Sequence, residues 1–298
     1  MTTANAFKTK FGWGKRPAEA NDHKPQKLKS TKPVALIIGG ILFLIVLLMA
    51  VWPSLFTHYD PYELDLMNAL KAPSVNHWFG TDNYGRDVFA RVVYGARVDL
   101  TIGFLAMIVP FFVGSLIGLV AAYYGKWVDA LIMRIQDIMT AFPFTILVIT
   151  IVTILGSNIS NLYIAIWLVG WKDYTKLVRS EALVEKNSEY VQAARVLGYS
   201  NRRIMFRHIL PNAISSAVVY AVSDVMLCML VGASLSFLGL GVQPPTPEWG
   251  AIISEGRPYI LIAWWMCALP GLALAVTGTA LSLLGEGLSH ILTNDGRQ

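Results

Sequence analysis

The stretch VALIIGGILFLIVLLMAVWPSLF, residues 34–56, contains no charged side chain. A transmembrane helix needs about 20 mostly apolar residues to cross roughly 30 Å of hydrocarbon, and this stretch is long enough. A cleavable signal peptide has a shorter apolar region, of about 7–15 residues, before small residues at the cleavage site. Residues 34–56 instead follow a polar tail and include Trp52-Pro53 near their end. We therefore predict a retained first transmembrane helix.

The composition of the whole chain agrees with a membrane protein. Of its 298 residues, 55% are hydrophobic and only 14% are charged, whereas soluble domains carry about 25% charged residues. This excludes a disordered chain, which needs low hydrophobicity and high charge, and argues against a soluble enzyme. The two cysteines, Cys228 and Cys267, both lie in apolar blocks and form neither a disulfide framework nor a zinc pattern.

Five further apolar blocks follow the first one. They cover residues 100–124, 138–155, 159–171, 213–240 and 259–284. The block at 159–171 is short, and the block at 213–240 contains a single ionisable residue, Asp224. Together the six blocks predict an all-α polytopic membrane protein with six transmembrane helices.

The positions of lysine and arginine predict the orientation. With the N-terminus inside, the inner segments hold 19 of these residues and the outer segments hold 5, which satisfies the positive-inside rule. We therefore expect both termini in the cytoplasm, a basic cytoplasmic tail at 1–33 and an extracytoplasmic segment at 57–99. A five-helix permease domain at 100–298 would then carry a basic cytoplasmic loop at about 172–211. The net charge of +5 arises from the tail and this loop and indicates no nucleic acid.

The chain carries no sign of its own energy source. A P-loop needs a glycine, four residues, and then Gly-Lys-Ser/Thr, and neither Gly14-Lys15 nor Gly125-Lys126 fits. The five histidines are scattered, so we expect no metal site. The sequence also lacks the HExxH and Gly-x-Ser-x-Gly motifs. We therefore expect no catalytic residue and no bound cofactor, and a membrane component whose energy comes from a partner.

The basic loop contains the sequence EYVQAARVLG at residues 189–198, and Pro211 follows Gly198 by thirteen residues. This pattern predicts a short amphipathic helix with small residues on one face, ended by a glycine that tolerates a positive φ. Such a helix suits docking into the groove of a partner protein. It equally suits an inner-leaflet helix held by anionic lipid, and the residues alone leave both interpretations open.

This stretch resembles the EAA loop of permease subunits in binding-protein-dependent ABC importers. The resemblance rests on Ala193-Ala194, on Gly198 after three further residues, and on the more distant Leu210-Pro211. In that family the loop forms a coupling helix that sits in a cleft of the ATPase subunit. Gln192 stands where the family usually has Glu. The resemblance implies an ATPase-coupling set made of Gln192, Ala193, Ala194, Leu197, Gly198, Arg202 and Pro211.

A second stretch, HWFGTDNYGRDV at residues 77–88, is similar to a signature of the C-type permeases of dipeptide, oligopeptide and nickel importers. From the residues alone, Thr81 or Asp82 can cap a helix whose apolar stripe begins at Val88. This predicts an amphipathic helix on the outer face, leading into the second span. We interpret six residues as a structural cluster rather than as substrate ligands or a binding-protein contact: Gly80, Thr81, Asp82, Gly85, Arg86 and Asp87.

A third stretch, LSFLGLG at residues 235–241 with a later Trp249-Gly250, resembles the end of the fifth span and the next outer loop in the same subfamily. Asp224 lies near the middle of that span. A charge at the bilayer centre costs at least about 2.5–3.5 kcal/mol on insertion scales, so it should face the protein interior or a water-filled path. Two hypotheses follow: Asp224 lines the translocation path and meets a cationic group of a peptide, or it is a structural acid bonded to a neighbouring helix.

The resemblance implies a type I importer fold in the bacterial inner membrane and a chain that is not an enzyme. It also implies a homologous second permease, two ATPase subunits that use ATP and Mg, and an extracytoplasmic substrate-binding protein. Peptides are the expected cargo, with nickel or another small solute as the alternative. A self-sufficient secondary transporter or channel, and a purely structural membrane scaffold, are the alternatives from other classes.

Overall fold

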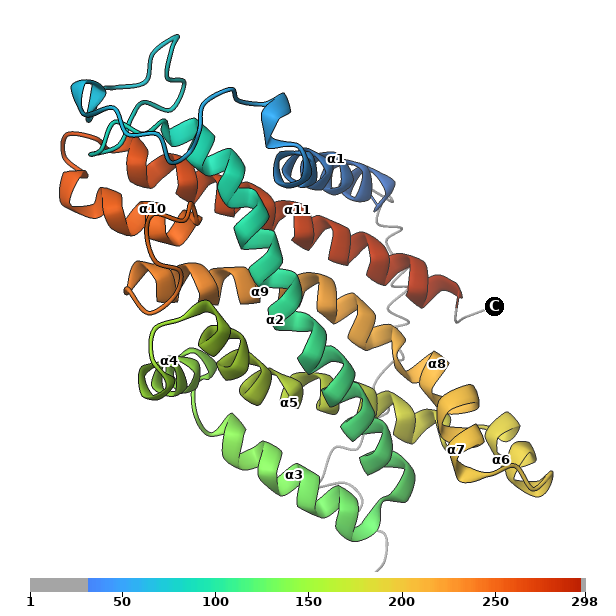
Figure 1. Ribbon diagram of the computed structural model, residues 1–298. Helices are drawn as coiled ribbons and strands as arrows, with labels where there is room; N and C mark the ends of the chain where they lie inside the picture. Colours follow the sequence, from blue (N-terminus) through green and yellow to red (C-terminus); the bar gives the residue numbers. More distant parts are fainter. Residues whose placement is uncertain (1–31, 296–298) are drawn as a thin grey trace, which may run out of the picture. The chain divides into compact units, whose positions relative to one another are not determined.

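A computed structural model describes residues 32–295, with side chains from 34 to 291. The basic tail expected at 1–33 therefore lies almost entirely outside the described residues. Within the described part, the regular secondary structure is helical, apart from one isolated bridge between Thr81 and Asp87. The expected all-α class is confirmed (Figure 1).

The helices differ widely in length. The long ones are α1 (Lys32–Val51), α2 (Val88–Tyr124), α5 (Ile159–Glu185), α9 (Ser215–Phe237) and α11 (Trp265–Asp295). The shorter ones are α3 (Lys126–Thr140), α4 (Phe144–Leu155), α6 (Glu189–Val196), α7 (Asn201–Arg203), α8 (Leu210–Ala213) and α10 (Trp249–Gly256). Short 3-10 turns cover Pro53–Leu55, Leu66–Asn68 and Arg257–Tyr259, and a π-helical segment covers Ile204–Ile209.

Four of these helices are long and apolar enough to cross a membrane: α1, α2, α9 and α11. The pair α3 and α4 adds a fifth span if the two are counted together, although they meet at 85°. Helix α5 begins apolar, but its second half carries charges from Lys172 onward. A multi-pass membrane protein is thus supported, whereas the predicted number of six spans is not confirmed.

The predicted boundary at residue 99, between an outer amphipathic helix and the second span, does not exist as a break. Helix α2 runs through it without interruption for 37 residues. Its cap is Asp87, whose carboxylate accepts from the Ala90 N–H at 2.6 Å, and not Thr81 or Asp82. The apolar stripe at Val88, Val92 and Ala96 is buried as predicted, but Ala90 and Arg91 outside the stripe are buried too, so these first turns have no polar face in water. Hydropathy locates the apolar core of a span, but the helix begins where a cap satisfies its N–H groups.

Two further boundaries differ from the sequence prediction. Residues 126–137, expected in a short turn, belong to helix α3, and the chain bends at Pro143 before α4. The basic loop expected from about residue 172 begins in the middle of α5, which continues to Glu185. Charged residues end a membrane-embedded stretch but do not end a helix, so a helix can extend past the bilayer into water.

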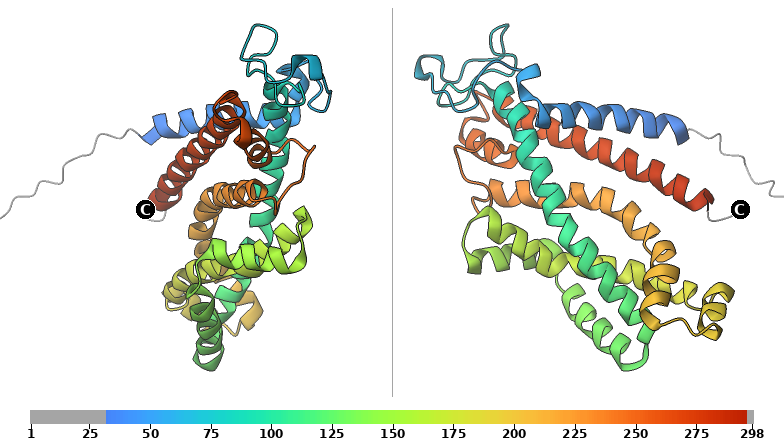
Figure 2. Two further views of the ribbon diagram at one scale, coloured as in Figure 1. Left: turned by 90° about the vertical axis from the view of Figure 1, so that its left-hand side faces the viewer. Right: turned by 45° about the vertical axis from the view of Figure 1, so that its right-hand side comes forward.

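The long helices pack in sequence-distant pairs. Helix α1 lies beside α11, and α2 contacts both α5 and α9 (Figures 1 and 2). Helices α2 and α5 approach closely at Gly114, where an added Cβ would lie 2.3 Å from the Trp171 carbonyl oxygen. At Gly118 it would lie 2.5 Å from the Thr175 carbonyl oxygen. Small residues four apart let two helix backbones meet in this way.

Candidate coupling surface and translocation path

Helix α6 has one buried face and one exposed end. Val191 and Ala194 are buried, whereas Gln192 and Ala193 are exposed. Just beyond the helix, Leu197 is 70% exposed. Large apolar side chains exposed together with small residues at a helix end are typical of a protein–protein contact. We call residues 192–198 the α6 tip.

The α6 tip ends in a turn that requires glycine. Gly198 has a φ of +76° and nothing lies within 4 Å of the position of an added Cβ. The Tyr199 N–H donates to the Ala194 carbonyl at 3.1 Å, and the Gly198 N–H donates to Arg195 at 3.0 Å. Helices frequently end in this way: one residue takes the left-handed conformation, and the N–H groups at and after it donate to the last carbonyls of the helix. It directs the chain away from the tip towards α7.

A polar cluster fixes α6 against the helices on both sides of it. The Tyr190 hydroxyl donates to the Glu185 carboxylate at the end of α5 and accepts from the Asn212 amide of α8 at 2.9 Å. Burial and the Glu185 carboxylate raise the pKa of Tyr190, so the phenol stays neutral and can donate. Pro211 is exposed next to this cluster. Three helices are therefore held at one point behind the tip.

The buried face of α6 belongs to an apolar cluster that reaches the membrane helices. Ala194 shares this cluster with Ala122 of α2, Ala182 of α5, Ile209 of the π-helical segment and Ala217 of α9. Close-packed interiors transmit displacements because they have few voids. The α6 tip is thus connected to the start of α9 through this cluster, by way of the π-helical segment and α8.

Basic side chains surround the tip. Arg195, Arg202, Arg203 and Arg207 are all exposed. The Arg203 guanidinium lies over the Tyr199 ring at 4.0 Å from its centroid, close enough for a cation–π interaction. The segment from the α6 tip to Arg207 therefore carries exposed positive charge.

Asp224 lies in the middle of α9 and faces α5. The Tyr174 hydroxyl of α5 donates to its carboxylate at 2.7 Å. Tyr174 is fully buried, whereas Asp224 is partly exposed. The carboxylate thus has one fixed donor and some access to space beyond the helix interface. This geometry is compatible with both hypotheses for Asp224.

Neither Tyr174 nor its neighbour Asp173 was singled out from the sequence. Asp173 of α5 interacts electrostatically with Asp224, and its carboxylate binds the Lys172 ammonium at 3.0 Å. The only sequence signal was that these charges follow directly on an apolar block. Because the block was assumed to end in a loop at residue 172, Asp173 was not placed beside the fifth span.

The six residues of the outer motif are all buried. Asp82 accepts from the Arg86 Nε at 2.6 Å and from Arg91 Nη1 at 2.8 Å. Both guanidinium groups also reach the Glu255 carboxylate of α10, at 3.0 and 2.6 Å. Burial opposes the positive charge of Arg86, yet the carboxylates of Asp82 and Glu255 outweigh it and raise its pKa. We call these four residues the outer ion cluster.

The remaining motif residues shape the backbone around the outer ion cluster. Gly80 and Gly85 have positive φ angles of 71° and 78°. An added Cβ on Gly85 would lie 1.7 Å from the Asp65 carbonyl oxygen. The Thr81 hydroxyl accepts from the Lys71 N–H at 2.8 Å, and Asp87 contacts the His77 ring at 2.9 Å. This burial favours the structural interpretation of the motif, which stays a prediction.

Arg91 and Glu255 complete the outer ion cluster and were missed in the sequence. Arg91 lies within an apolar stripe and Glu255 is about 160 residues further along the chain. A charged residue inside an apolar stripe is itself a signal, since charges are almost never fully buried unless they are paired. The partner, however, is fixed only by the fold.

Residues 114–295 match a family model described as the binding-protein-dependent transport system inner membrane component. The match covers more than half of the chain, and it includes the α6 tip and Asp224. The chain belongs to this family. It is therefore a membrane component of a transport system and not an enzyme, as expected from the sequence.

Three similar proteins align with most of the length of this chain. A dipeptide transport system permease protein from Alkalihalophilus pseudofirmus is 41% identical over 90% of this chain and 87% of its own length. A glutathione transport system permease protein from Pectobacterium atrosepticum is 39% identical over 86% of this chain and 85% of its own. A probable D,D-dipeptide transport system permease protein from Escherichia coli is 39% identical over 87% of both chains.

Membership in this family agrees with the chemistry of the described residues. No group of three or more His, Cys, Asp or Glu side chains among them could hold a metal ion. Several of the acids bind arginine, lysine or tyrosine side chains, and others, such as Glu248, accept from backbone N–H groups. The described part of the chain thus has three notable features: the exposed α6 tip, the Asp224 carboxylate among the membrane helices, and the buried outer ion cluster.

Proposed function

We propose that this chain is the permease subunit of an ATP-driven peptide importer, and that it forms half of the translocation path. The observation that carries the proposal is the α6 tip, exposed at Leu197 and joined through Ala194 to a buried apolar cluster that also includes Ala217 of α9. The names of the three relatives, which are dipeptide and glutathione permeases, support peptides as cargo. A homologous second permease would supply the other half.

The proposed coupling step follows from the packing. Two ATPase subunits bind ATP and Mg and close, and the α6 tip moves with the cleft that holds it. The apolar cluster around Ala194 then carries this displacement to the start of α9. Gln192 has no negative charge, so the contact would rest on apolar and small residues, with the surrounding arginines facing acidic groups of the partner.

The proposal also fixes the orientation and the outer partner. The α6 tip and both termini would face the cytoplasm, where the ATPases are. The segment 57–87 and α10 would face outward, where a binding protein delivers the peptide. The partly exposed Asp224 carboxylate would meet the cationic amino end of a peptide as it passes, since opposite charges attract strongly where water is scarce.

Cross-linking within the assembled complex tests the coupling role. A cysteine at Ala193, which is exposed, should form a cross-link to an ATPase subunit, whereas a cysteine at Ser180, which lies exposed on α5, should not. Leu197→Glu should uncouple ATP hydrolysis from peptide uptake because it places a charge in an apolar contact. The matched control Arg202→Glu changes a charged residue outside the α6 tip, and it should weaken the coupling of ATP hydrolysis to uptake less than Leu197→Glu does.

The rival proposal, a self-sufficient transporter, predicts a different result. In proteoliposomes that contain this chain alone, uptake of dipeptides or nickel would then occur and would survive Leu197→Glu. Uptake that needs the second permease, the ATPases and the binding protein supports the importer. Comparing dipeptides, longer peptides and nickel in the complete system identifies the cargo.

A further inference from the structure

The last turn of α2 lies against the segment that carries the α6 tip. Tyr123, the second-last residue of this helix, is half-buried and packs against the apolar cluster that contains Ala194. Its ring and its hydroxyl also contact polar and charged side chains outside that cluster. The coupling step proposed above uses the apolar cluster alone, so these contacts form a further connection, between α6 and α2.

Three polar side chains meet Tyr123, and they come from before, within and after α6. The Lys186 ammonium, at the end of α5, lies over the Tyr123 ring at 5.8 Å from its centroid. The Arg195 guanidinium, in the last turn of α6, lies over the same ring at 5.9 Å. At the start of α7, Asn201 Oδ1 accepts from the Tyr123 hydroxyl at 2.7 Å. One side chain of α2 thus joins all three elements.

Lys186 also caps the end of α2. Its ammonium donates to the carbonyls of Ala122 and Tyr123, at 2.9 and 2.6 Å, which are among the last carbonyls that a helix leaves without a partner. Burial and the positive charge of Arg195 lower the pKa of Lys186, so the two cations repel each other. The face of an aromatic ring attracts cations within about 6 Å, and the Tyr123 ring therefore helps to hold both.

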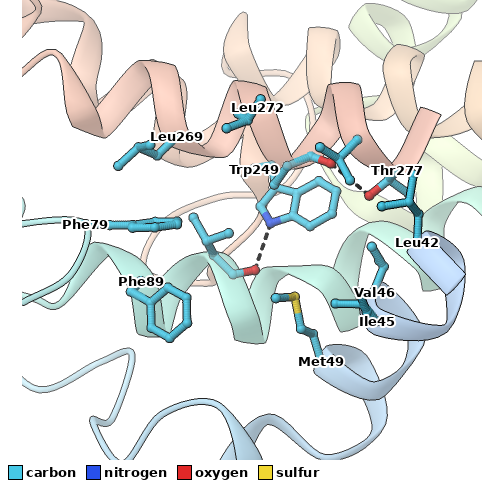
Figure 3. A pocket seen from close by; sticks show the side chains of 13 residues that line it. Leu42, Ile45, Val46, Met49, Phe79, Phe89, Trp249, Leu269, Leu272 and Thr277 are labelled. Carbon is cyan, nitrogen blue, oxygen red and sulfur yellow. Dashed lines mark hydrogen bonds between the residues drawn. The ribbon is translucent and has the colours of Figure 1, made fainter. Parts of the chain in front are cut away.

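The other end of α2 is fixed to different elements. The Trp249 indole N–H of α10, beside an apolar cavity between α1, α2 and α11 (Figure 3), donates to the Val92 carbonyl at 2.9 Å. Arg91 binds Asp82 of the outer segment at 2.8 Å. These contacts lie in the first turns of α2, whereas Tyr123 lies in its last turn. The two ends of this helix are therefore bound to different parts of the fold.

We propose that Tyr123 is a positioning residue for coupling, which carries the ATPase-driven displacement of the α6 tip to α2, beside the route to α9. This inference rests on the coupling role proposed above for the α6 tip. A displacement of α6 moves Arg195 directly, and Asn201 follows through the turn at Gly198. If α2 stayed behind, the hydrogen bond to Asn201 would break and the guanidinium would leave the ring. The contacts therefore favour a joint movement of α6, α7 and the end of α2.

The number of peptides imported per ATP tests this role. The complete complex is reconstituted in proteoliposomes, and dipeptide uptake and ATP hydrolysis are measured in the same sample. Tyr123→Leu keeps an apolar side chain but removes the ring and the hydroxyl, so it should lower this number by about 2- to 30-fold, the range for residues that carry coupling energy. The matched control Tyr124→Leu makes the same change at the next, exposed position and should lower it by less than about twofold.

The hydroxyl contact is tested separately by a double-mutant cycle. Tyr123→Phe keeps the ring and loses only the hydrogen bond to Asn201, so it should lower the number of dipeptides per ATP less than Tyr123→Leu does. Asn201→Ala should have the same effect as Tyr123→Phe, and the double variant should lower the number no further, because all three lack the same bond. Additive losses would overturn the assignment of this contact. Tyr123→Phe also serves as the test if Tyr123→Leu does not assemble.

A cross-link distinguishes this inference from the proposed function. A cysteine at Ala193 should cross-link to an ATPase subunit as well in the Tyr123→Leu complex as in the unsubstituted one. A normal cross-link together with an unchanged number of dipeptides per ATP in Tyr123→Leu and Tyr123→Phe would overturn the role of Tyr123 and leave the proposed function standing. A cross-link lost only in Tyr123→Leu would show that Tyr123 merely holds α6 in place, which also overturns the inference. No cross-link in the unsubstituted complex would overturn both.

Discussion

The Asp99 carboxylate of α2 accepts a hydrogen bond from the backbone N–H of Trp249 at 3.1 Å, although 150 residues separate the two. Both residues are buried. Next to them, the Glu248 carboxylate accepts from the N–H groups of Gly250 and Ala251 at 3.0 and 2.7 Å. One buried carboxyl group, on Asp99, therefore links the start of α10 to α2, and a second, on Glu248, caps α10 itself.

Glu248→Ala should destabilise the protein because it removes the cap of α10 and leaves two buried N–H groups without a partner. We expect a loss of about 1–3 kcal/mol in the free energy of unfolding. The midpoint of thermal unfolding of the purified complex measures this. Glu248→Gln keeps one acceptor oxygen and should lose less, and equal losses for both variants would contradict the capping role.

Stability should also depend on pH through Glu248. Burial raises the pKa of Glu248 above its ordinary value of 4.5, so the folded state binds this proton more tightly than the unfolded state does. The contribution is complete below the ordinary value and is lost as the pH rises through the raised folded value. Unfolding midpoints measured across this window should fall with pH, and Glu248→Gln should flatten the dependence. An unchanged or steeper dependence in Glu248→Gln would refute this assignment.

Arg91→Met should cost about 3–5 kcal/mol in unfolding free energy, because it leaves the buried acids of the outer ion cluster without a full set of partners. Arg97→Met is the matched control on the same helix. Its guanidinium binds only the carbonyls of Ala50 and Val51, at 2.7 and 3.0 Å, and we expect a loss of about 1 kcal/mol. Expression level and unfolding midpoint distinguish the two, and a similar cost for both would show that the cluster contributes little.

Two glycine substitutions should differ sharply in cost. Gly198→Ala meets no neighbouring atom, so it should cost only the strain of a positive φ, about 1–2 kcal/mol. Gly85→Ala places a methyl group 1.7 Å from the Asp65 carbonyl oxygen, and the outer segment must then unfold or shift. The yield of folded complex after purification measures both effects. Equal yields would contradict the fold of the segment 57–87.

Asp224→Asn should reduce uptake of peptides that carry a free amino end if Asp224 lines the path, because it removes a negative charge while keeping the shape. Tyr174→Phe is the control, since it removes the hydrogen bond at 2.7 Å but leaves the charge. Uptake and peptide-stimulated ATP hydrolysis measure the effect. If Asp224→Asn leaves both unchanged for every peptide, Asp224 is a structural acid.

The sequence predicted the membrane class and the α6 helix well because both depend on local patterns. Apolar blocks mark helices such as α1, and the glycine after Leu197 marks the end of a short amphipathic helix. The end of α2 at Tyr124 matches the end of its apolar block, whereas the start of α2 at Val88, the helix α3 within the expected turn and the extension of α5 past residue 172 were not predicted. These ends depend on caps and on packing partners, such as Asp87 at the start of α2, which hydropathy does not report.

The candidate site was predictable only where its residues are neighbours in sequence. The set from Gln192 to Gly198 could be named in advance because one turn of helix holds most of it. The partners Tyr174 of Asp224 and Glu255 of Arg91 could not, since they are brought close only by the packing of distant helices. A buried charge signals that a partner exists but not where in the chain it lies.

Helix α2 joins the two ends of the molecule described here. Its first turn meets the outer ion cluster through Arg91, and its last carbonyls, at Ala122 and Tyr123, accept from the Lys186 ammonium just before α6 at 2.9 and 2.6 Å. A helix of 37 residues has a length of about 55 Å. If α2 moves as one rigid body, a tilt of about 5° about its α6 end displaces the opposite end by about 5 Å over this length. Because Arg91 at that end binds Asp82 and Glu255, such a tilt would move these two acids together with the helix.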